Sequence, residues 1–162
     1  GQPVAIGEVG EIVVSGPDVF AGYSRAPDLT HEVLKAGRYH TGDLARMDEE
    51  GYVYIVDRKK DMVISGGFNV YPSEVEAVLY QHEAVADACV FGIPDDKWGE
   101  SVKQGRQIDA AALDAFCSQR LGGFKRPRMF EFVSSLPKNP NGKVMRKAVQ
   151  APYWSGQGRM VN

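Results

Sequence analysis

One stretch, residues 57–76, combines charged residues with glycines: DRKKDMVISGGFNVYPSEVE. A run of charges is followed by a short apolar segment and then by Gly66 and Gly67. Because glycine has no Cβ and tolerates positive φ, backbone at these two positions could lie directly against a ligand. The simpler interpretation is a tight turn, which is what a Gly-Gly pair by itself usually indicates. Ser73 and Glu76 have the spacing of a capping box and predict a helix that begins at or just after Ser73.

A second candidate, Lys143, ends the sequence PKNPNGK at residues 137–143. A lysine ammonium is a compact, mobile charge that can bind a carboxylate and phosphoryl oxygens together as negative charge builds up. A Gly-Lys pair alone is a weak signal, and the chain has no Walker-type GxxxxGK[ST] sequence. The alternative is a solvated lysine after a turn.

Composition sets limits on function. The chain has 162 residues, 43% hydrophobic and 25% charged, which suits one ordinary domain or two small pieces. A net charge of -2 predicts neither nucleic-acid binding nor an anionic membrane surface. No apolar run has the length of a membrane span, and the first residues lack the features of a signal peptide, so we expect a cytoplasmic protein. Cys89 and Cys117 lie among apolar neighbours and are expected to be buried thiols, with no disulfide or metal site.

Residues 1–56 have the pattern of short strands and turns. We expect a strand at 11–16, a short helix at 30–36 capped by Thr30, and a hairpin formed by 44–47 and 52–56 around Gly51. These elements do not supply a self-sufficient core.

The remaining residues alternate helical and strand-like patterns. The expected elements are a helix at 74–82, an apolar strand at 84–91, a turn at 92–95, a helix capped by Asp109 and stopped by Gly122-Gly123, a strand at 129–133, a loop at 136–142 and a short or frayed helix at 143–149. This mixture predicts a small α+β domain of about 100 residues.

Taken together, residues 57–76, 39–43 (YHTGD) and 137–143 resemble the adenylate-forming acyl-CoA synthetase (AMP-binding) superfamily, in its acyl-/aryl-CoA ligase branch. These enzymes activate a carboxylic acid with ATP and transfer the acyl group from the acyl-adenylate to CoA. The resemblance implies that residues 1–57 are the β-rich end of a large N-terminal domain and that 58–162 are the C-terminal lid domain. We therefore expect a fragment of an AMP-forming acid–CoA ligase that is inactive without its missing N-terminal domain, where the acid-binding pocket lies.

The resemblance also implies roles for single residues. Lys143 acts in adenylation, Asp43 accepts hydrogen bonds from the ATP ribose hydroxyls, Arg58 contacts the ribose, and Lys60 is the hinge. A carboxylate suits the ribose because it is acceptor-only and can take two donors. Without the resemblance, Gly42-Asp43 would be read as a turn and the charges from Arg58 onward as a solvated run.

For CoA, the resemblance implies that Gly66 and Gly67 line the pantetheine channel. The residues implied to hold the CoA nucleotide are Trp98, Phe124, Arg126 and Arg128. An aromatic face suits adenine and guanidinium groups suit phosphates, although Trp98 could equally be a core residue. ATP and CoA are the expected cofactors, and Mg²⁺ is expected with ATP but without a ligand in this fragment.

One segment departs from the family pattern. Where the family has a long apolar strand, residues 102–108 read VKQGRQI, with only two apolar residues. A stretch is therefore missing near 103–104, by deletion or by omission from the chain. We favour omission, because the motifs on both sides are intact.

Other interpretations remain open. Luciferases and the amino-acid-activating domains of peptide synthetases share most of these motifs, although a carrier domain would be expected to follow the latter. A non-catalytic, lid-like binding module is a further alternative. Pro137 and Gly142-Lys143 also fit the PxxxxGK pattern at which bacterial acyl-CoA synthetases are switched off by acetylation, so a protein acetyltransferase acting on Lys143 is a possible partner.

Overall fold

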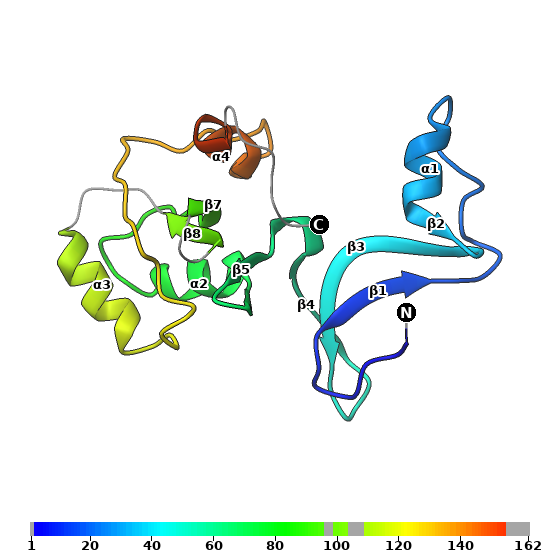
Figure 1. The fold of residues 1–162 in the computed structure, drawn as a ribbon, viewed down its shortest axis with the longest axis horizontal. Coiled ribbons are helices and arrows are strands. Elements are labelled where there is room, and N and C mark those ends of the chain that lie inside the picture. Colours follow the sequence, from blue (N-terminus) through cyan, green and yellow to red (C-terminus); the bar gives the residue numbers. More distant parts are fainter. Residues whose placement is uncertain (1, 96–98, 104–108, 155–162) are drawn as a thin grey trace. The chain divides into compact units, whose positions relative to one another are not determined.

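The computed structural model describes residues 2–95, 99–103 and 109–154 (Figure 1). The chain divides into two compact units, 1–60 and 61–162. A short 3-10 helix, η1 (Lys59–Asp61), contains the point of division. Each unit is described by itself.

Unit 1 is an antiparallel sheet built around one long strand, β3 (Arg38–Met47). This strand pairs with β1 (Gly10–Val14), with the two-residue β2 (Leu34–Lys35) and with β4 (Val53–Arg58). The predicted β3–β4 hairpin is confirmed. Its turn is held by the Asp48 carboxylate, which accepts hydrogen bonds from the amides of Glu50 and Tyr52, and Gly51 has a φ of +88°.

The helix of unit 1, α1 (Pro27–Val33), begins three residues before the predicted start. Ala26 is its N-cap and Pro27 occupies the first helical position, where the missing N–H of proline costs no hydrogen bond. The prediction that Thr30 caps the helix is wrong, because the Thr30 hydroxyl lies inside the helix and donates to the carbonyl of Ala26.

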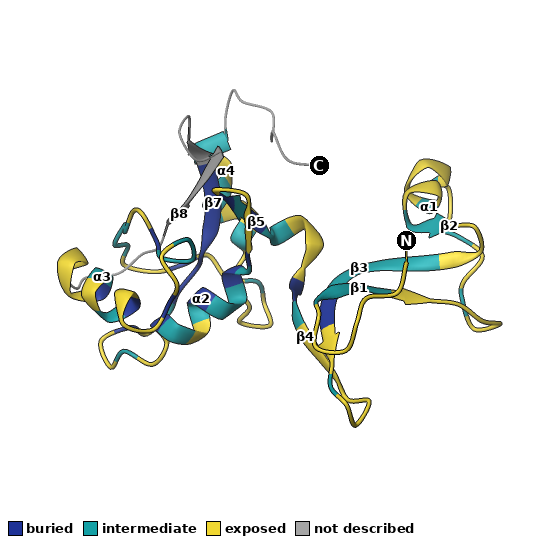
Figure 2. Ribbon diagram, turned by 60° about the horizontal axis from the view of Figure 1, so that its bottom comes forward, coloured by how far each residue is buried: buried dark blue, intermediate teal, exposed yellow. Residues whose placement is uncertain are grey.

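Few apolar side chains are buried in unit 1. Among the described residues of this unit, Leu44 and Ala45 are the buried hydrophobic ones. Much of β4 is exposed, including Val53, Tyr54 and Ile55 (Figure 2). This confirms the prediction that these strands lack a self-sufficient core.

The described part of unit 2 combines a small sheet with three α-helices. The strand order is β6-β5-β8-β7, where β5 is Val63–Ser65, β6 Phe68–Val70, β7 Phe91–Asp95 and β8 Gly99–Lys103. The helices are α2 (Pro72–Leu79), α3 (Ala110–Ser118) and α4 (Arg146–Trp154). This mixture of helix and sheet confirms the predicted α+β class.

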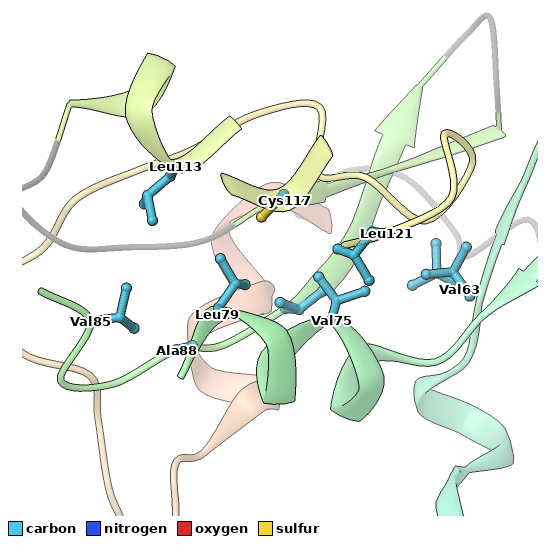
Figure 3. Packing of buried hydrophobic residues seen from close by; sticks show 10 residues of the cluster. Val63, Val75, Leu79, Val85, Ala88, Leu113, Cys117 and Leu121 are labelled. Atoms are coloured by element: carbon cyan, nitrogen blue, oxygen red, sulfur yellow. The ribbon is translucent and has the colours of Figure 1, made fainter. Parts of the chain in front are cut away.

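The core of unit 2 lies where α2 and α3 face each other (Figure 3). Val75 and Leu79 of α2 and Leu113 and Cys117 of α3 are 0–2% exposed. Burying each such aliphatic side chain contributes about 1.5–3 kcal/mol. Cys117 and Cys89 are free cysteines and both are buried, which confirms the prediction of buried thiols. Burial raises the pKa of the Cys89 thiol to about 11.

The start of α2 differs from the prediction. Tyr71 is the N-cap and the helix begins at Pro72, so Ser73 lies inside it and the capping-box prediction is wrong. The Glu76 carboxylate instead accepts a hydrogen bond from the amide of Val90 at 2.7 Å. Glu76 therefore accepts a hydrogen bond from Val90, which is distant along the chain, instead of capping the start of its own helix.

Two strand predictions are also wrong. Residues 84–90 form no ladder, and the strand β7 occupies 91–95, where a turn was predicted. The amide of Ala88 donates to the Tyr80 hydroxyl and that of Val90 donates to Glu76, so side chains take the place of a neighbouring strand. Residues 129–133 are likewise outside the ladders of the described chain, although Phe130 and Phe132 pack against the core.

Helices α3 and α4 differ in how well they match the predictions from the sequence. Asp109 caps α3 as predicted, its carboxylate accepting from the amide of Ala111 at 3.0 Å, but α3 ends at Ser118, before the two glycines. Helix α4 begins at Arg146 and not at Lys143, because the backbone of Lys143 is held in the preceding loop. The predicted loop at 136–142 is confirmed.

Candidate functional site

Lys143 ends a loop that is organised by one side chain, Asn139. The Asn139 Oδ1 accepts hydrogen bonds from the amides of Asn141 (3.0 Å) and Lys143 (2.9 Å). The Asn139 amide donates to the carbonyl of Lys143 at 2.9 Å, and the Gly142 amide donates to the carbonyl of Asn139 at 2.9 Å. Gly142 has a φ of +79°, which favours glycine. Both backbone groups of Lys143 are therefore fixed, while Lys143 itself is exposed.

The stem of this loop is attached to the body of unit 2. The Met145 amide donates to the carbonyl of Pro137 at 2.8 Å, and Lys138 forms an isolated bridge with Val144. The Lys138 ammonium also pairs with Asp87 at 2.8 Å. Leu136 is buried in a second apolar cluster, against which Val144 packs. These contacts hold both ends of the loop against unit 2, while the Lys143 side chain stays exposed.

Asp43 and Arg58 are brought together in unit 1 by strand pairing. They are opposite each other in the β3–β4 ladder, and the Arg58 Nε lies 3.0 Å from the Asp43 Oδ1. Their side chains are 30% and 55% exposed, so the pair adds little stability and leaves both groups accessible to a ligand. The turn interpretation of Gly42-Asp43 is wrong, because both residues lie within β3.

A neighbouring cluster around Glu11 was missed by the sequence analysis. The Glu11 Oε2 lies 3.1 Å from the His40 Nδ1 and 3.0 Å from the Lys59 Nζ, and its Oε1 accepts the amide of Gly42 at 3.2 Å. Partial burial raises the pKa of Glu11, but hydrogen bonds and charges from His40 and Lys59 outweigh it and leave that pKa lowered. The cluster ties β1 to the backbone beside Asp43 and to the residue before Lys60. The sequence carried no signal for it, because Glu11 and Lys59 are far apart along the chain.

Lys60 itself lies in η1 and is exposed. It is the last residue of unit 1, so the division between the two units follows it directly.

The Gly66-Gly67 turn joins β5 to β6, with φ values of +58° and +83°. A Cβ built on Gly67 would meet nothing within 4 Å. The next residue, Phe68, is 56% exposed and stacks on Phe124, with ring centroids 4.6 Å apart and an interplanar angle of 26°. Phe68 was also missed by the sequence analysis, and it places Phe124 beside the glycine turn.

The remaining candidates for the CoA nucleotide are placed unequally. The Arg126 Nε pairs with the Asp114 Oδ1 of α3 at 3.0 Å, with both side chains 40–43% exposed. Lys125 pairs with Glu74 at 2.6 Å, and its Nζ lies 5.7 Å from the Phe124 ring centroid. Arg128 is exposed, whereas Trp98 lies outside the described residues.

None of the helices in the described ranges has the length and hydropathy needed to cross a bilayer. Within the same ranges, no three His, Cys, Asp or Glu side chains come together in a way that could hold a metal ion.

Comparison with known proteins defines the class. Residues 74–143 match the model of the AMP-binding enzyme C-terminal domain. The chain belongs to the adenylate-forming, AMP-binding superfamily, and what it matches is the C-terminal portion of acyl- and aryl-CoA ligases.

Two curated relatives illustrate this. The chain is 48% identical to the medium/long-chain-fatty-acid–CoA ligase FadD8 of Mycobacterium tuberculosis, covering 99% of this chain and 30% of the relative. It is 47% identical to a feruloyl-CoA synthase of Amycolatopsis sp, covering 94% and 32%. The chain thus spans about a third of the length of the curated relatives it matches.

Solved structures agree. The o-succinylbenzoate CoA synthetase (MenE) of Bacillus subtilis, in complex with its acyl-adenylate intermediate, has a TM-score of 0.83 at 38% identity, over 92% of this chain and 32% of that one. The ATP-bound MatB of Rhodopseudomonas palustris has a TM-score of 0.86 at 38% identity, over 94% and 32%.

Proposed function

We propose that the chain is the C-terminal part of an ATP-dependent acid–CoA ligase. The complete enzyme forms an acyl-adenylate from a carboxylic acid and ATP, then transfers the acyl group to CoA and releases AMP. The observation that carries this proposal is the exposed Lys143 on a loop whose backbone is fixed on both sides, in a chain that matches such ligases.

Lys143 supplies positive charge in the first half-reaction. Its ammonium binds the substrate carboxylate and the α-phosphoryl oxygens, where negative charge increases in the transition state. A lysine whose backbone is fixed before the reaction needs less rearrangement to bring its ammonium to the reacting groups, so the Asn139 loop contributes to this role. Asp43 accepts the ribose hydroxyls of ATP and Arg58 lies against the same ribose. Mg²⁺ enters with ATP, and we assign it no ligand in this chain.

The second half-reaction uses a different set of residues. Gly66 and Gly67 line the pantetheine channel, because a side chain there would obstruct the thiol. Phe124, Arg126, Arg128 and Trp98 hold the nucleotide of CoA. We further propose that residues 1–57 complete a large N-terminal domain, that 58–162 form the lid, and that Lys60 is the pivot on which the lid presents each set in turn.

The substrate is a fatty or aromatic carboxylic acid. This choice rests on the names of the relatives, which include fatty-acid–CoA ligases, feruloyl-CoA synthases and a 2-succinylbenzoate–CoA ligase. We place the enzyme in the cytoplasm, where the free thiols of Cys89 and Cys117 stay reduced.

The test is to replace Lys143 by alanine in the complete enzyme. Acid-dependent pyrophosphate exchange should fall by about 10²–10³, the usual effect of losing one preorganised charge-stabilising group. Thioester formation from supplied acyl-adenylate should be largely retained. Acetylation of Lys143 by a protein acetyltransferase, which neutralises the same charge, should stop adenylation for the same reason.

The matched control is Lys147→Ala, which removes an exposed lysine in α4. It should leave both half-reactions unchanged. A comparable loss of both half-reactions in Lys143→Ala would refute the role of Lys143. If the complete wild-type protein shows no acid-dependent exchange with fatty or aromatic acids, the ligase proposal fails and the non-catalytic binding module takes its place.

A further inference from the structure

Arg146 bridges two carboxylates from different elements. It is the first residue of α4 and follows Lys143 by three positions. Its Nη1 lies 3.1 Å from the Asp61 Oδ2 of η1, and its Nη2 lies 2.8 Å from the Glu76 Oε1 of α2. The three side chains are only 15–21% exposed. Partial burial makes such charge-assisted hydrogen bonds stronger than those of a solvated pair.

The two carboxylates differ in what they are attached to. Glu76 Oε1 also accepts the amide of Val90 at 2.7 Å, so it belongs to the body of unit 2. Asp61 is the first residue of unit 2 and follows the proposed pivot Lys60 directly. One guanidinium therefore connects the start of α4 both to Glu76 of α2 and to Asp61, the residue that follows the proposed pivot.

On the other side of Arg146, the chain leads straight into the Lys143 loop. The amide of Met145, the residue before Arg146, donates to the carbonyl of Pro137 and closes the stem of that loop. A displacement of Arg146 would therefore be transmitted to the loop through one residue.

We propose that Arg146 is a positioning residue that fixes the Lys143 loop relative to the pivot by its ion pair with Asp61. When the lid turns, Lys143 arrives at the reacting phosphoryl group in a defined place because its support is tied to the point of rotation. Misplacing a catalytic group by about 1 Å can cost about 10²-fold in rate, so such a tie affects adenylation directly. This inference rests on the proposed function of Lys143.

The competing explanation is that Arg146 only stabilises the fold. A matched pair of substitutions in the complete enzyme distinguishes the two explanations. Asp61→Asn and Glu76→Gln each neutralise one of the two carboxylates that pair with the Arg146 guanidinium, with almost no change of side-chain shape. Under our proposal, Asp61→Asn slows pyrophosphate exchange about tenfold or more. It changes thioester formation from supplied acyl-adenylate by no more than about twofold. Glu76→Gln lowers the thermal midpoint but leaves the ratio of the two half-reactions as in the wild type.

Asp61 is adjacent to the pivot, so its substitution could act on the hinge without Arg146. A double-mutant cycle tests this. Adding Asp61→Asn to Arg146→Met should slow pyrophosphate exchange no further. Arg146→Lys keeps the positive charge but not the planar guanidinium that reaches both carboxylates, so its exchange rate should lie between those of Arg146→Met and the wild type. Multiplicative losses in the double variant would overturn the proposal, as would equal losses in both half-reactions of Asp61→Asn.

Two references keep the result interpretable. If Arg146→Met does not fold, the comparison of Asp61→Asn with Glu76→Gln still tests the proposal, because both variants retain Arg146. If Lys143→Ala proves to have normal pyrophosphate exchange, the proposed role of Lys143 fails and the present inference fails with it. If Lys143→Ala loses pyrophosphate exchange while Asp61→Asn keeps it, only the present inference fails.

Discussion

Asn139 organises the loop that carries Lys143, the residue that we propose to act in adenylation. Its Oδ1 accepts two amides, one of them that of Lys143, and its own backbone binds the Lys143 carbonyl. Each such hydrogen bond contributes about 0.5–1.5 kcal/mol. Without the side chain, the loop would retain its backbone bonds but lose the acceptor at its centre.

We predict that Asn139→Ala in the complete enzyme accelerates hydrogen exchange of the Lys143 amide and slows pyrophosphate exchange, with thioester formation spared. Asn139→Asp, which keeps an acceptor oxygen in the same place, should retain most of the protection of that amide. Asn141→Ala is the control, because Asn141 contributes its backbone amide to the network. Unchanged protection in Asn139→Ala would show that the oxygen does not hold the loop.

At the scale of elements, the backbone conformation of the β5–β6 turn suggests a place where a ligand can pass close to the chain. Gly67 combines a φ of +83° with open space around its Cβ position. A side chain there would strain the backbone by about 1–2 kcal/mol, although its Cβ would meet no atom within 4 Å. Under the proposed function, a larger effect on activity comes from a ligand that passes the turn.

We therefore predict that Gly67→Leu spares pyrophosphate exchange and slows CoA transfer by obstructing the pantetheine channel. Gly51→Leu is a matched control, since Gly51 also has a strongly positive φ, +88°, and open space, but lies in the β3–β4 hairpin. Both variants should lose similar stability on thermal unfolding. Equal slowing of CoA transfer in the two would mean that backbone strain, and not obstruction, is the cause.

The two failed strand predictions belong to this scale as well. An apolar segment becomes a strand only where a partner offers backbone hydrogen bonds, and neither 84–90 nor 129–133 has such a partner in the described ladders. The stretch predicted to be missing near 103–104 borders on 104–108, outside the described residues, and stays a prediction.

At the scale of the whole molecule, the residues proposed to act in adenylation are an incomplete set. In our proposal Asp43 and Arg58 hold a ribose and Lys143 neutralises charge, and we expect the acid-binding pocket in the part of the relatives that this chain does not span. Unit 1 also exposes apolar side chains of β4. Exposed apolar patches mark surfaces that bind a ligand or another protein segment.

The isolated chain of 162 residues should therefore show no acid-dependent pyrophosphate exchange. Adding the purified N-terminal part of the complete enzyme is the informative companion experiment, since any activity regained in the mixture would come from reassembly. Exchange by the isolated chain alone would contradict the proposed division of labour.

Much of this protein could be predicted from its sequence, wherever the determining physics is local. Glycines that need positive φ, the Asp109 cap and the β3–β4 turn depend on neighbours within a few residues, and so they were predicted correctly. The superfamily could also be predicted from the sequence, because each motif is a short stretch of residues that are neighbours along the chain.

Only the tertiary structure decided the long-range pairings. Glu76 had a local use as a capping residue, but burial beside Arg146 and the Val90 amide offers it stronger, charge-assisted partners. The cluster around Glu11 and the stacking of Phe68 on Phe124 likewise join residues that are distant along the chain. No pattern in the sequence predicts such contacts, because they form only when the folded chain brings separate elements together.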